Sequence, residues 1–332
     1  MSKLVDQFRD RARLLGKTIV LPEALADQRT LKAARIFLDE GLGTPLVVGS
    51  NEALLEAARQ AQISLEGILS IDIDAFPRFG EMVALYQQIR AKDKMSDDEV
   101  RKLLHDPLWF GAMLVRMGLA DGMTAGAINT TANVIRASIK CIGPREGLKT
   151  VSSCFLMIVP DPQFGKEGAL IFSDCGVIPA PTPDQLVDIG DAAAQSCKQL
   201  LGVEPVVAYL SFSTKGSADH PDAKKMSDAA VALAVRRPGL AVDGELQGDS
   251  ALIASVGKSK APGSTVAGHA NTLIFPDLGA GNIAYKLTQR LAKAEAYGPL
   301  LQGLRLPVND LSRGATTADV VQVATITALQ TQ

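Results

Sequence analysis

Short apolar runs rich in β-branched residues alternate along this chain with longer segments of helical periodicity. Thr18–Leu21 and Pro45–Val48 have the composition of strands, and Asp27–Glu40 between them has the pattern of a helix that ends at Gly41. Such alternation is typical of parallel strands joined by helical crossovers. The sequence therefore predicts an α/β protein built from open sheets.

A change of pattern near residue 148 indicates a second domain. The apolar runs Val151–Val159 and Ala169–Phe172 are separated by a turn containing Pro and Gly, which favours a strand pair over a helical crossover. The α/β rhythm then resumes with strands at Val206–Ser211, Leu240–Val242 and Thr272–Phe275 and helices at Pro221–Arg236 and Asn282–Glu295. A second break falls at residues 297–299. The chain has 332 residues, and at roughly 150 residues per domain this length corresponds to about two domains.

Several helix starts carry strong local signals. Ser96 with Glu99, and Thr182 with Gln185, have the spacing of a capping box. Residues 107 and 183 are prolines that each follow a good N-cap residue. Residues 1–16 mix charged and apolar side chains and predict an amphipathic helix, not a signal peptide.

Composition excludes several classes of function. The 34 Lys and Arg nearly balance the 36 Asp and Glu, so there is no basic surplus to attract nucleic acid or anionic lipid. No run of about 18 apolar residues is free of charge, so we expect no membrane span. The four cysteines (Cys141, Cys154, Cys175 and Cys197) lack CxxC spacing, and the three histidines lack ligand spacing. We therefore expect a soluble cytoplasmic protein without a metal site.

A glycine-rich segment near the end of the second domain is the first candidate site. Gly279, Gly281 and Ala284 match a GxGxxA pattern between a strand and a helix. A dinucleotide site would also need an acidic residue about 20 positions later, and none lies there. The pattern instead favours a phosphate site or a tight turn at a helix start near Gly281 and Asn282.

A second glycine-rich segment covers Ala120–Lys140. Thr130 and Thr131 open a helix there, and capping alone accounts for one of the two hydroxyls. Arg136 follows on the same helix, where it is either a surface residue or, beside a cleft, a phosphate ligand. The strand end Ser211–Lys215 offers a possible anion-binding loop, or simple solvation of the strand end.

The third candidate is the stretch Pro307–Val321. A hydroxyl, a guanidinium and a carboxylate lie within eight residues there, as Ser312, Arg313 and Asp319. A polar loop followed by a capping box from Thr316 to Asp319 accounts for this spacing without any chemistry.

Six segments together resemble the phosphate acetyltransferases, or phosphotransacetylases, of the wider phosphate acyltransferase group. They are Ala120–Arg136, Phe172–Leu186, Ser211–Pro221, Val242–Ala251, Asn271–Leu287 and Leu311–Val321. The resemblance covers essentially the whole chain and corresponds to the short, catalytic-domain form of the family.

The resemblance implies two α/β domains with a cleft between them, similar in fold to isocitrate and isopropylmalate dehydrogenases. The first domain would comprise residues 1–147 and 299–332, and the second residues 148–298. It also implies a homodimer that interconverts acetyl phosphate plus coenzyme A with acetyl-CoA plus phosphate, without a metal or a tightly bound cofactor.

The resemblance also assigns roles to residues. Asp319 would be the base that takes the proton of the coenzyme A thiol, Ser312 a donor to the thiol or the oxyanion, and Arg313 a phosphate ligand. Arg90 and Arg136 match arginines linked to coenzyme A. Thr131, Gly281 and Asn282 are further phosphate candidates.

Three alternatives stay open on the sequence. A propionyl or butyryl phosphate transferase would share the mechanism with a larger acyl pocket. A non-catalytic regulatory module of the same fold is disfavoured by the intact Ser312, Arg313 and Asp319. A nicotinamide dehydrogenase of similar fold is disfavoured by the missing acidic residue.

Overall fold

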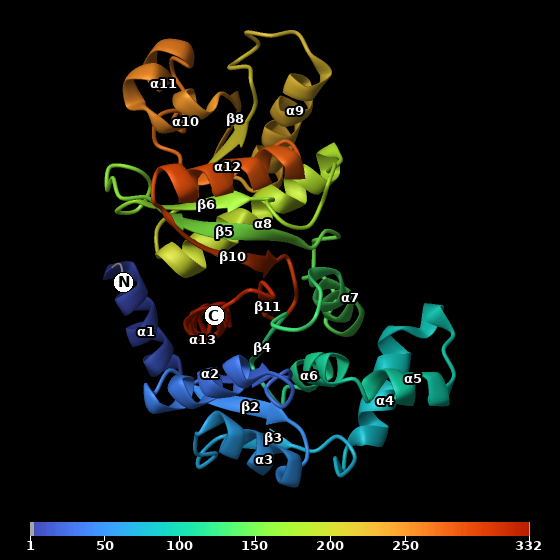
Figure 1. Ribbon diagram of the computed structural model, residues 1–332. Coiled ribbons are helices and arrows are strands. Elements are labelled where there is room, and N and C mark those ends of the chain that lie inside the picture. Colours follow the sequence, from blue (N-terminus) through green and yellow to red (C-terminus); the bar gives the residue numbers. More distant parts are fainter. Residues whose placement is uncertain (1–2, 332) are drawn as a thin grey trace. The chain divides into compact units, whose positions relative to one another are not determined.

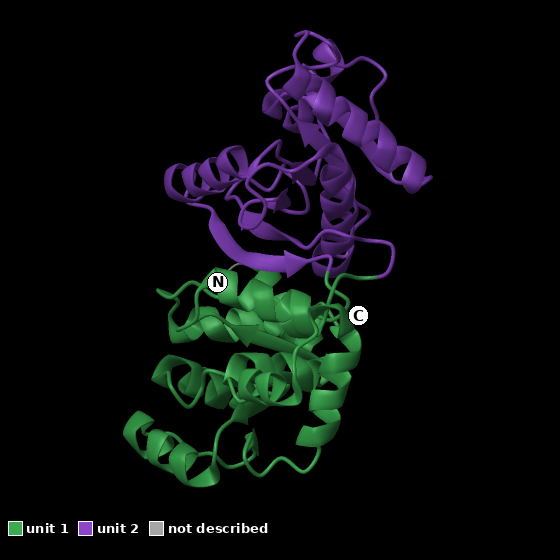
Figure 2. Cartoon of the chain, turned by 90° about the vertical axis from the view of Figure 1, so that its right-hand side faces the viewer, with its two compact units in different colours: residues 1–145, 304–332 green, residues 146–303 purple. Residues whose placement is uncertain are grey.

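The computed structural model describes residues 3–331, and these form two compact units (Figures 1 and 2). The first unit comprises the chain up to Arg145 together with the segment from Leu304 onward, and the second is Glu146–Gly303. The second boundary lies five residues later than the break expected at 298, because the strand β10 (Glu295–Gln302) pairs antiparallel with β5 (Ser152–Ile158) and so belongs to the second unit.

The first unit is built on a parallel sheet with the strand order β11-β4-β1-β2-β3. Its strands are β1 (Thr18–Leu21), β2 (Thr44–Val48), β3 (Leu69–Ile71), β4 (Gly122–Ala125) and β11 (Val308–Asp310). Its helices are α1 (Lys3–Leu15), α2 (Gln28–Asp39), α3 (Asn51–Ala61), α4 (Phe79–Ile89), η1 (Ala91–Asp93), α5 (Asp97–Leu104), α6 (Pro107–Arg116), α7 (Thr131–Cys141) and α13 (Thr317–Leu329).

Helices cover both faces of this sheet. Val20 lies in a core shared with α4–α7, so its neighbours Ile19 and Leu21 point to the opposite face, where α2 and α13 pack. The edge strand β11 and the helix α13 come from the C-terminal segment, which thus completes the first unit.

The second unit holds a mixed sheet with the order β10-β5-β6-β9-β7-β8. Its remaining strands are β6 (Ala169–Ser173), β7 (Val206–Leu210), β8 (Ala241–Leu246) and β9 (Thr272–Ile274), and its helices are α8 (Pro183–Leu201), α9 (Pro221–Arg236), α10 (Gly248–Leu252), α11 (Ala254–Lys260) and α12 (Leu278–Leu291). The strand pair expected around residue 160 is confirmed, because β5 and β6 run antiparallel.

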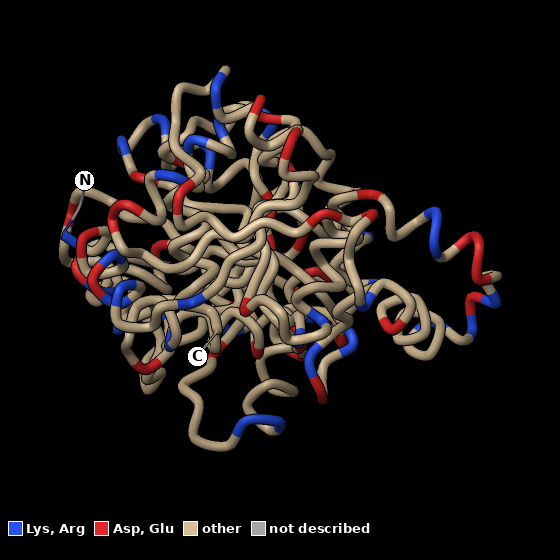
Figure 3. Tube along the Cα trace, turned by 90° about the horizontal axis from the view of Figure 1, so that it is seen from below, with Lys and Arg blue, Asp and Glu red and all other residues tan. Residues whose placement is uncertain are grey.

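The local sequence signals hold in this fold. Both expected capping boxes form, at Ser96 and at Thr182, and both prolines stand in the first turn of their helices. Basic and acidic residues are interspersed along the trace (Figure 3). No helix within residues 3–331 is long and apolar enough to cross a membrane.

Candidate active site

A polar turn joins β11 to α13 and carries two of the three predicted catalytic residues. The turn is closed by a hydrogen bond of 2.8 Å from the Ala315 N–H to the Ser312 carbonyl, and the Ser312 hydroxyl accepts one of 3.2 Å from the Gly314 N–H. Ser312 and Arg313 are exposed. Within the described chain, the Arg313 guanidinium has no hydrogen-bond or ion-pair partner, so it is available to an anion.

Asp319 stands in the first turn of α13, and the capping box expected there is confirmed. Its Oδ2 accepts hydrogen bonds of 2.8 Å from both the N–H and the hydroxyl of Thr316. Both bonds end on the same oxygen, and the residue is exposed. Oδ1 is therefore left for a substrate, so the capping role and a role as a base are compatible.

The loop from β4 to α7 lies against this turn. The Leu311 N–H donates 2.7 Å to the Ala125 carbonyl, which continues the β11–β4 pairing into the turn. Thr130 caps α7, and Thr131 is its first residue. The Thr131 hydroxyl donates 2.5 Å to Oδ2 of Asp310, the last residue of β11, so it is already engaged within the chain.

Glu23, for which the sequence predicts no role, accepts hydrogen bonds from the backbone N–H groups of the β4–α7 loop. Its buried carboxylate accepts hydrogen bonds of 2.8, 2.7 and 2.9 Å from the N–H groups of Gly126, Ala127 and Asn129. A row of backbone N–H groups of this kind is an anion-binding concavity. Here the anion is the protein's own carboxylate, and the loop is thereby held in one shape.

Arg29 holds both segments from the side of α2. Its guanidinium donates to the carbonyls of Arg313 at 2.9 Å, Ala315 at 2.8 Å and Ala127 at 2.9 Å. Its Nε contacts Asp27, the N-cap of α2, at 3.0 Å. The planar fork of an arginine suits such a triple role.

The two arginines that resemble coenzyme A ligands differ in their surroundings. Arg136 is exposed, and within residues 3–331 its guanidinium donates only to the Asn133 side chain, at 3.3 Å. Arg90 is engaged by both oxygens of Asp93, at 3.0 and 2.8 Å, and Asp93 also accepts 2.5 Å from Lys140 of α7. Hydrogen bonds from Arg90 and Lys140 lower the pKa of Asp93 to about 2. The Arg136 guanidinium therefore has more hydrogen-bond donors available to a ligand than that of Arg90.

The expected helix start near Gly281 and Asn282 is wrong. The helix α12 begins four residues earlier, at Leu278, because the Asp277 carboxylate caps it by accepting 2.8 Å from the Ala280 N–H. A Cβ on Gly281 would lie 2.3 Å from the Asp174 carbonyl, and Asn282 donates 3.3 Å to the Cys175 carbonyl. Both residues thus pack α12 onto the segment after β6.

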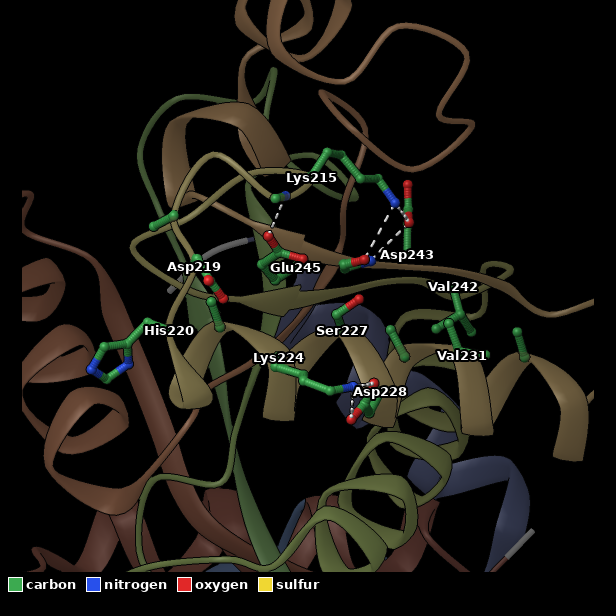
Figure 4. A pocket seen from close by; sticks show the side chains of 16 residues that line it. Lys215, Asp219, His220, Lys224, Ser227, Asp228, Val231, Val242, Asp243 and Glu245 are labelled. Atoms are coloured by element: carbon green, nitrogen blue, oxygen red, sulfur yellow. Dashed lines mark hydrogen bonds and ion pairs between the residues drawn. The ribbon is translucent and has the colours of Figure 1, made fainter.

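A pocket of about 690 Å³ lies between α9 and β8 in the second unit (Figure 4). It includes the loop after β7 in which an anion site was possible. Glu245 accepts 2.7 Å from the Gly216 N–H, and Lys215 and Lys224 are paired with Asp243 and Asp228. The anion position in this loop is therefore taken by a carboxylate of the chain itself.

No three His, Cys, Asp or Glu residues between 3 and 331 are grouped so that they could hold an ion. All four cysteines are free and buried.

Comparison with known proteins identifies the family. A model of the phosphate acetyl/butaryl transferase family matches residues 3–328. The chain belongs to this family. Among curated members, the phosphate acetyltransferase of Acetivibrio thermocellus is 45% identical over 99% of this chain and 98% of its own length. The phosphate acetyltransferase of Bacillus subtilis is 40% identical over 99% of both chains.

Solved structures of phosphate acetyl/butaryl transferase relatives agree with the fold. A phosphotransacetylase from Streptococcus pyogenes superposes with a TM-score of 0.93 at 38% identity, covering 100% of this chain and 99% of that one. The EutD phosphotransacetylase from Staphylococcus aureus gives 0.91 at 36% identity, with coverage of 99% and 98%.

Proposed function

We propose that this protein transfers an acetyl group reversibly between acetyl phosphate and coenzyme A, and that Ser312, Arg313 and Asp319 carry the reaction. The observation that carries the proposal is the exposed turn of the first unit. Among residues 3–331, the Arg313 guanidinium in that turn has no partner, and Oδ1 of Asp319, in the first turn of α13, accepts no hydrogen bond. The two residues are six positions apart, in a member of an acyl phosphate transferase family.

The reaction needs a base, a donor to the carbonyl and a cation for phosphate. Asp319 takes the proton of the coenzyme A thiol, because only the thiolate is a good nucleophile. The sulfur attacks the acetyl carbon, the C–S bond forms, and the bond from carbon to the phosphate oxygen breaks. Ser312 donates to the developing oxyanion, and Arg313 binds the departing phosphate, which finally receives the proton from Asp319.

Direct transfer is favoured over an acetyl-cysteine intermediate. Burial raises the pKa of Cys154 to about 12 and that of Cys197 to about 11, and it raises the pKa values of Cys141 and Cys175 as well. A buried, protonated thiol is a poor nucleophile. The acetyl group therefore passes from phosphate to coenzyme A in a ternary complex.

Arg136 is proposed to bind a phosphate of coenzyme A, with Arg90 as a second ligand. The weak contact of Arg136 with Asn133 leaves its donors available, whereas Arg90 must share its fork with Asp93. Of the further phosphate candidates, Thr131 donates its hydroxyl to Asp310, and Gly281 and Asn282 pack against the segment after β6.

The acyl group proposed is acetyl, with propionyl and butyryl phosphate as the alternative substrates. One methylene in a pocket changes binding by only about 1 to 3 kcal/mol, so a longer acyl phosphate is expected to react more slowly and not to be excluded. The nicotinamide alternative loses support, because the Asp277 carboxylate occupies the helix N-terminus where a pyrophosphate would bind.

We also propose that the protein acts in the cytoplasm as a homodimer, as the family resemblance implies. Light scattering on the purified protein tests the oligomeric state, and a monomeric mass would contradict it.

The test of the function is thioester formation from coenzyme A and acetyl, propionyl or butyryl phosphate. Asp319→Asn keeps an oxygen to accept from Thr316 but removes the base, and should lower kcat by roughly 10² to 10⁴. Thr316→Ala is the matched control, because it removes the cap and keeps the carboxylate. If both variants lose activity equally, Asp319 acts through helix capping. If no acyl phosphate reacts with the unaltered protein, the proposed function is wrong.

A further inference from the structure

The carboxyl group of Asp310 is buried in the first unit at the root of the Ser312–Thr316 turn. The side chain is 1% exposed, and Oδ2 accepts the hydrogen bond of 2.5 Å from Thr131. Oδ1 is buried and lacks a partner among the described residues. A buried carboxyl oxygen without a hydrogen bond lowers the stability of the fold, so we asked what the Asp310 side chain contributes at this position.

The surroundings of Asp310 show what the carboxyl group holds. Its Oδ1 lies against Gly126, where an added Cβ would come within 2.3 Å of it. On the other side, the Gly126 N–H donates 2.8 Å to Glu23. Two carboxyl groups thus enclose one glycine of the β4–α7 loop, and the hydroxyl at the start of α7 is bonded to one of them.

Asp310 directly precedes the turn that carries Ser312 and Arg313, and Thr131 begins the helix that carries Arg136. The hydrogen bond from the Thr131 hydroxyl to the Asp310 carboxyl group therefore links two segments that are 179 residues apart in the sequence. A second link, from the Leu311 N–H to the Ala125 carbonyl, lies one residue away. Together they fix where the chain leaves β11.

We propose that Asp310 is a positioning residue for the transfer reaction, which it serves by holding the Ser312–Arg313 turn against the first residue of α7 through the Thr131 hydroxyl. This inference rests on the proposed function of the turn. Asp310 itself does not touch the reacting atoms. A displacement of about 1 Å in a catalytic group costs on the order of 10²-fold in rate, so a loosened turn is expected to lower kcat.

The variants separate the hydrogen bond from other effects. Thr131→Val and Asp310→Ala break the link, whereas Thr131→Ser and Asp310→Asn preserve a hydroxyl and an acceptor. Ser138→Ala is the matched control, because that buried hydroxyl lies on the same helix and bonds only to the Val134 carbonyl within it. Thermal unfolding of each variant reports whether the fold is retained.

Two readouts apply to every variant. The first is kcat and the KM for coenzyme A. The second, independent of activity, is the rate of tryptic cleavage after the exposed Arg313, measured against cleavage after Lys166 in the β5–β6 connection of the second unit. A turn released from α7 is expected to be cut faster at Arg313 alone.

We expect Thr131→Val and Asp310→Ala to lower kcat about tenfold or more, with a much smaller change in the KM for coenzyme A, and to speed cleavage after Arg313 several-fold. Thr131→Ser, Asp310→Asn and Ser138→Ala should stay near the unaltered protein in both readouts.

Three results would overturn the inference. Unchanged kcat and unchanged cleavage in Thr131→Val, with or without a lower Tm, would reduce the link to a structural contact. Equal loss in Asp310→Asn and Asp310→Ala would mean that the reaction needs the ionisable group and not the hydrogen bond. Equal cleavage after Arg313 in all variants would refute the link itself. If the unaltered protein forms no thioester, the proposed function fails instead, and the cleavage readout still tests the link.

Discussion

The Arg29 guanidinium donates a hydrogen bond of 2.9 Å to the backbone carbonyl of Arg313. One arginine thus positions another, through the main chain and not through the side chain. The Arg313 guanidinium itself has no partner in the described part of the chain. The contact also makes the geometry of the turn depend on Arg29 of α2, which lies 284 residues earlier in the sequence.

Arg29→Lys should lower kcat about tenfold while the protein remains folded. All the donors of a lysine ammonium lie on one nitrogen. A lysine therefore cannot reach the carbonyls of Ala127, Arg313 and Ala315 together, as the Arg29 guanidinium does. Steady-state kinetics and a thermal melt check this. Arg35→Lys is the matched control, because Arg35 lies on the same helix and its guanidinium donates to Asp39 and to the Glu66 carbonyl and makes no contact with the turn. Equal losses of kcat in both variants would show that the contacts of Arg29 with the turn are not what matters.

Gly126→Ala should destabilise the first unit by more than about 2 kcal/mol. Gly126 has a φ of +112°, and its new Cβ would meet Asp310 Oδ1 at 2.3 Å and the Leu311 nitrogen at 2.6 Å. Denaturant unfolding measures the loss. Gly118→Ala isolates the backbone effect, because Gly118 has a φ of +73° with nothing within 4 Å. Similar losses in the two variants would refute the steric argument.

The contribution of Asp310 to the stability of the protein should fall as the pH rises from about 4 to about 7. Burial raises the pKa of Asp310 to about 7, the nearby Glu23 carboxylate acts in the same direction, and the Thr131 hydrogen bond opposes it. The folded state thus binds this proton more tightly than the unfolded chain, whose pKa is about 3.9. Its stabilising effect is present below pH ~4 and is lost as the pH passes ~7.

Comparison with Asp310→Asn isolates this effect, because the amide does not titrate in this range. Between pH 5 and pH 8, the free energy of unfolding should decrease more in the unaltered protein, by about 2.5 kcal/mol of the roughly 4 kcal/mol that the whole shift represents. Parallel pH curves for the two proteins would contradict the raised pKa.

Arg136→Ala should raise the KM for coenzyme A and affect that for dephospho-coenzyme A much less, if the guanidinium holds the 3′-phosphate. Removing a charge-assisted hydrogen bond costs about 1.5 to 3 kcal/mol, so a change of roughly tenfold or more is expected. Steady-state kinetics with both substrates decide it. Equal effects on the two substrates would mean that Arg136 contacts a part of coenzyme A other than the 3′-phosphate.

The sequence predicts those features whose signals lie within a few residues of each other. The capping box from Thr316 to Asp319 and the helix start at Thr130 could be identified because the interacting groups are three residues apart. The GxGxxA spacing predicts a helix start at Gly281 and Asn282, whereas α12 begins at Leu278 because Asp277 is the residue that caps it.

The supports of the candidate site could not be predicted in this way. Glu23 and Gly126 are 103 residues apart, and nothing local to either shows that they meet. Arg29 and Asp310 likewise acquire their roles only when β1, β4 and β11 lie side by side in one sheet. Local chemistry thus identified the turn, whereas tertiary pairing determines what holds it.

The discontinuous first unit also sets an order of events during synthesis. The ribosome makes all of residues 146–303 before it reaches β11 and α13, which pack on β4, α1 and α2. Domains generally fold as they emerge, so the second unit is able to fold while the first still lacks its edge strand. The turn bearing Ser312 and Arg313 is thus assembled last, and a nascent chain stalled before residue 308 lacks the whole of the proposed catalytic segment.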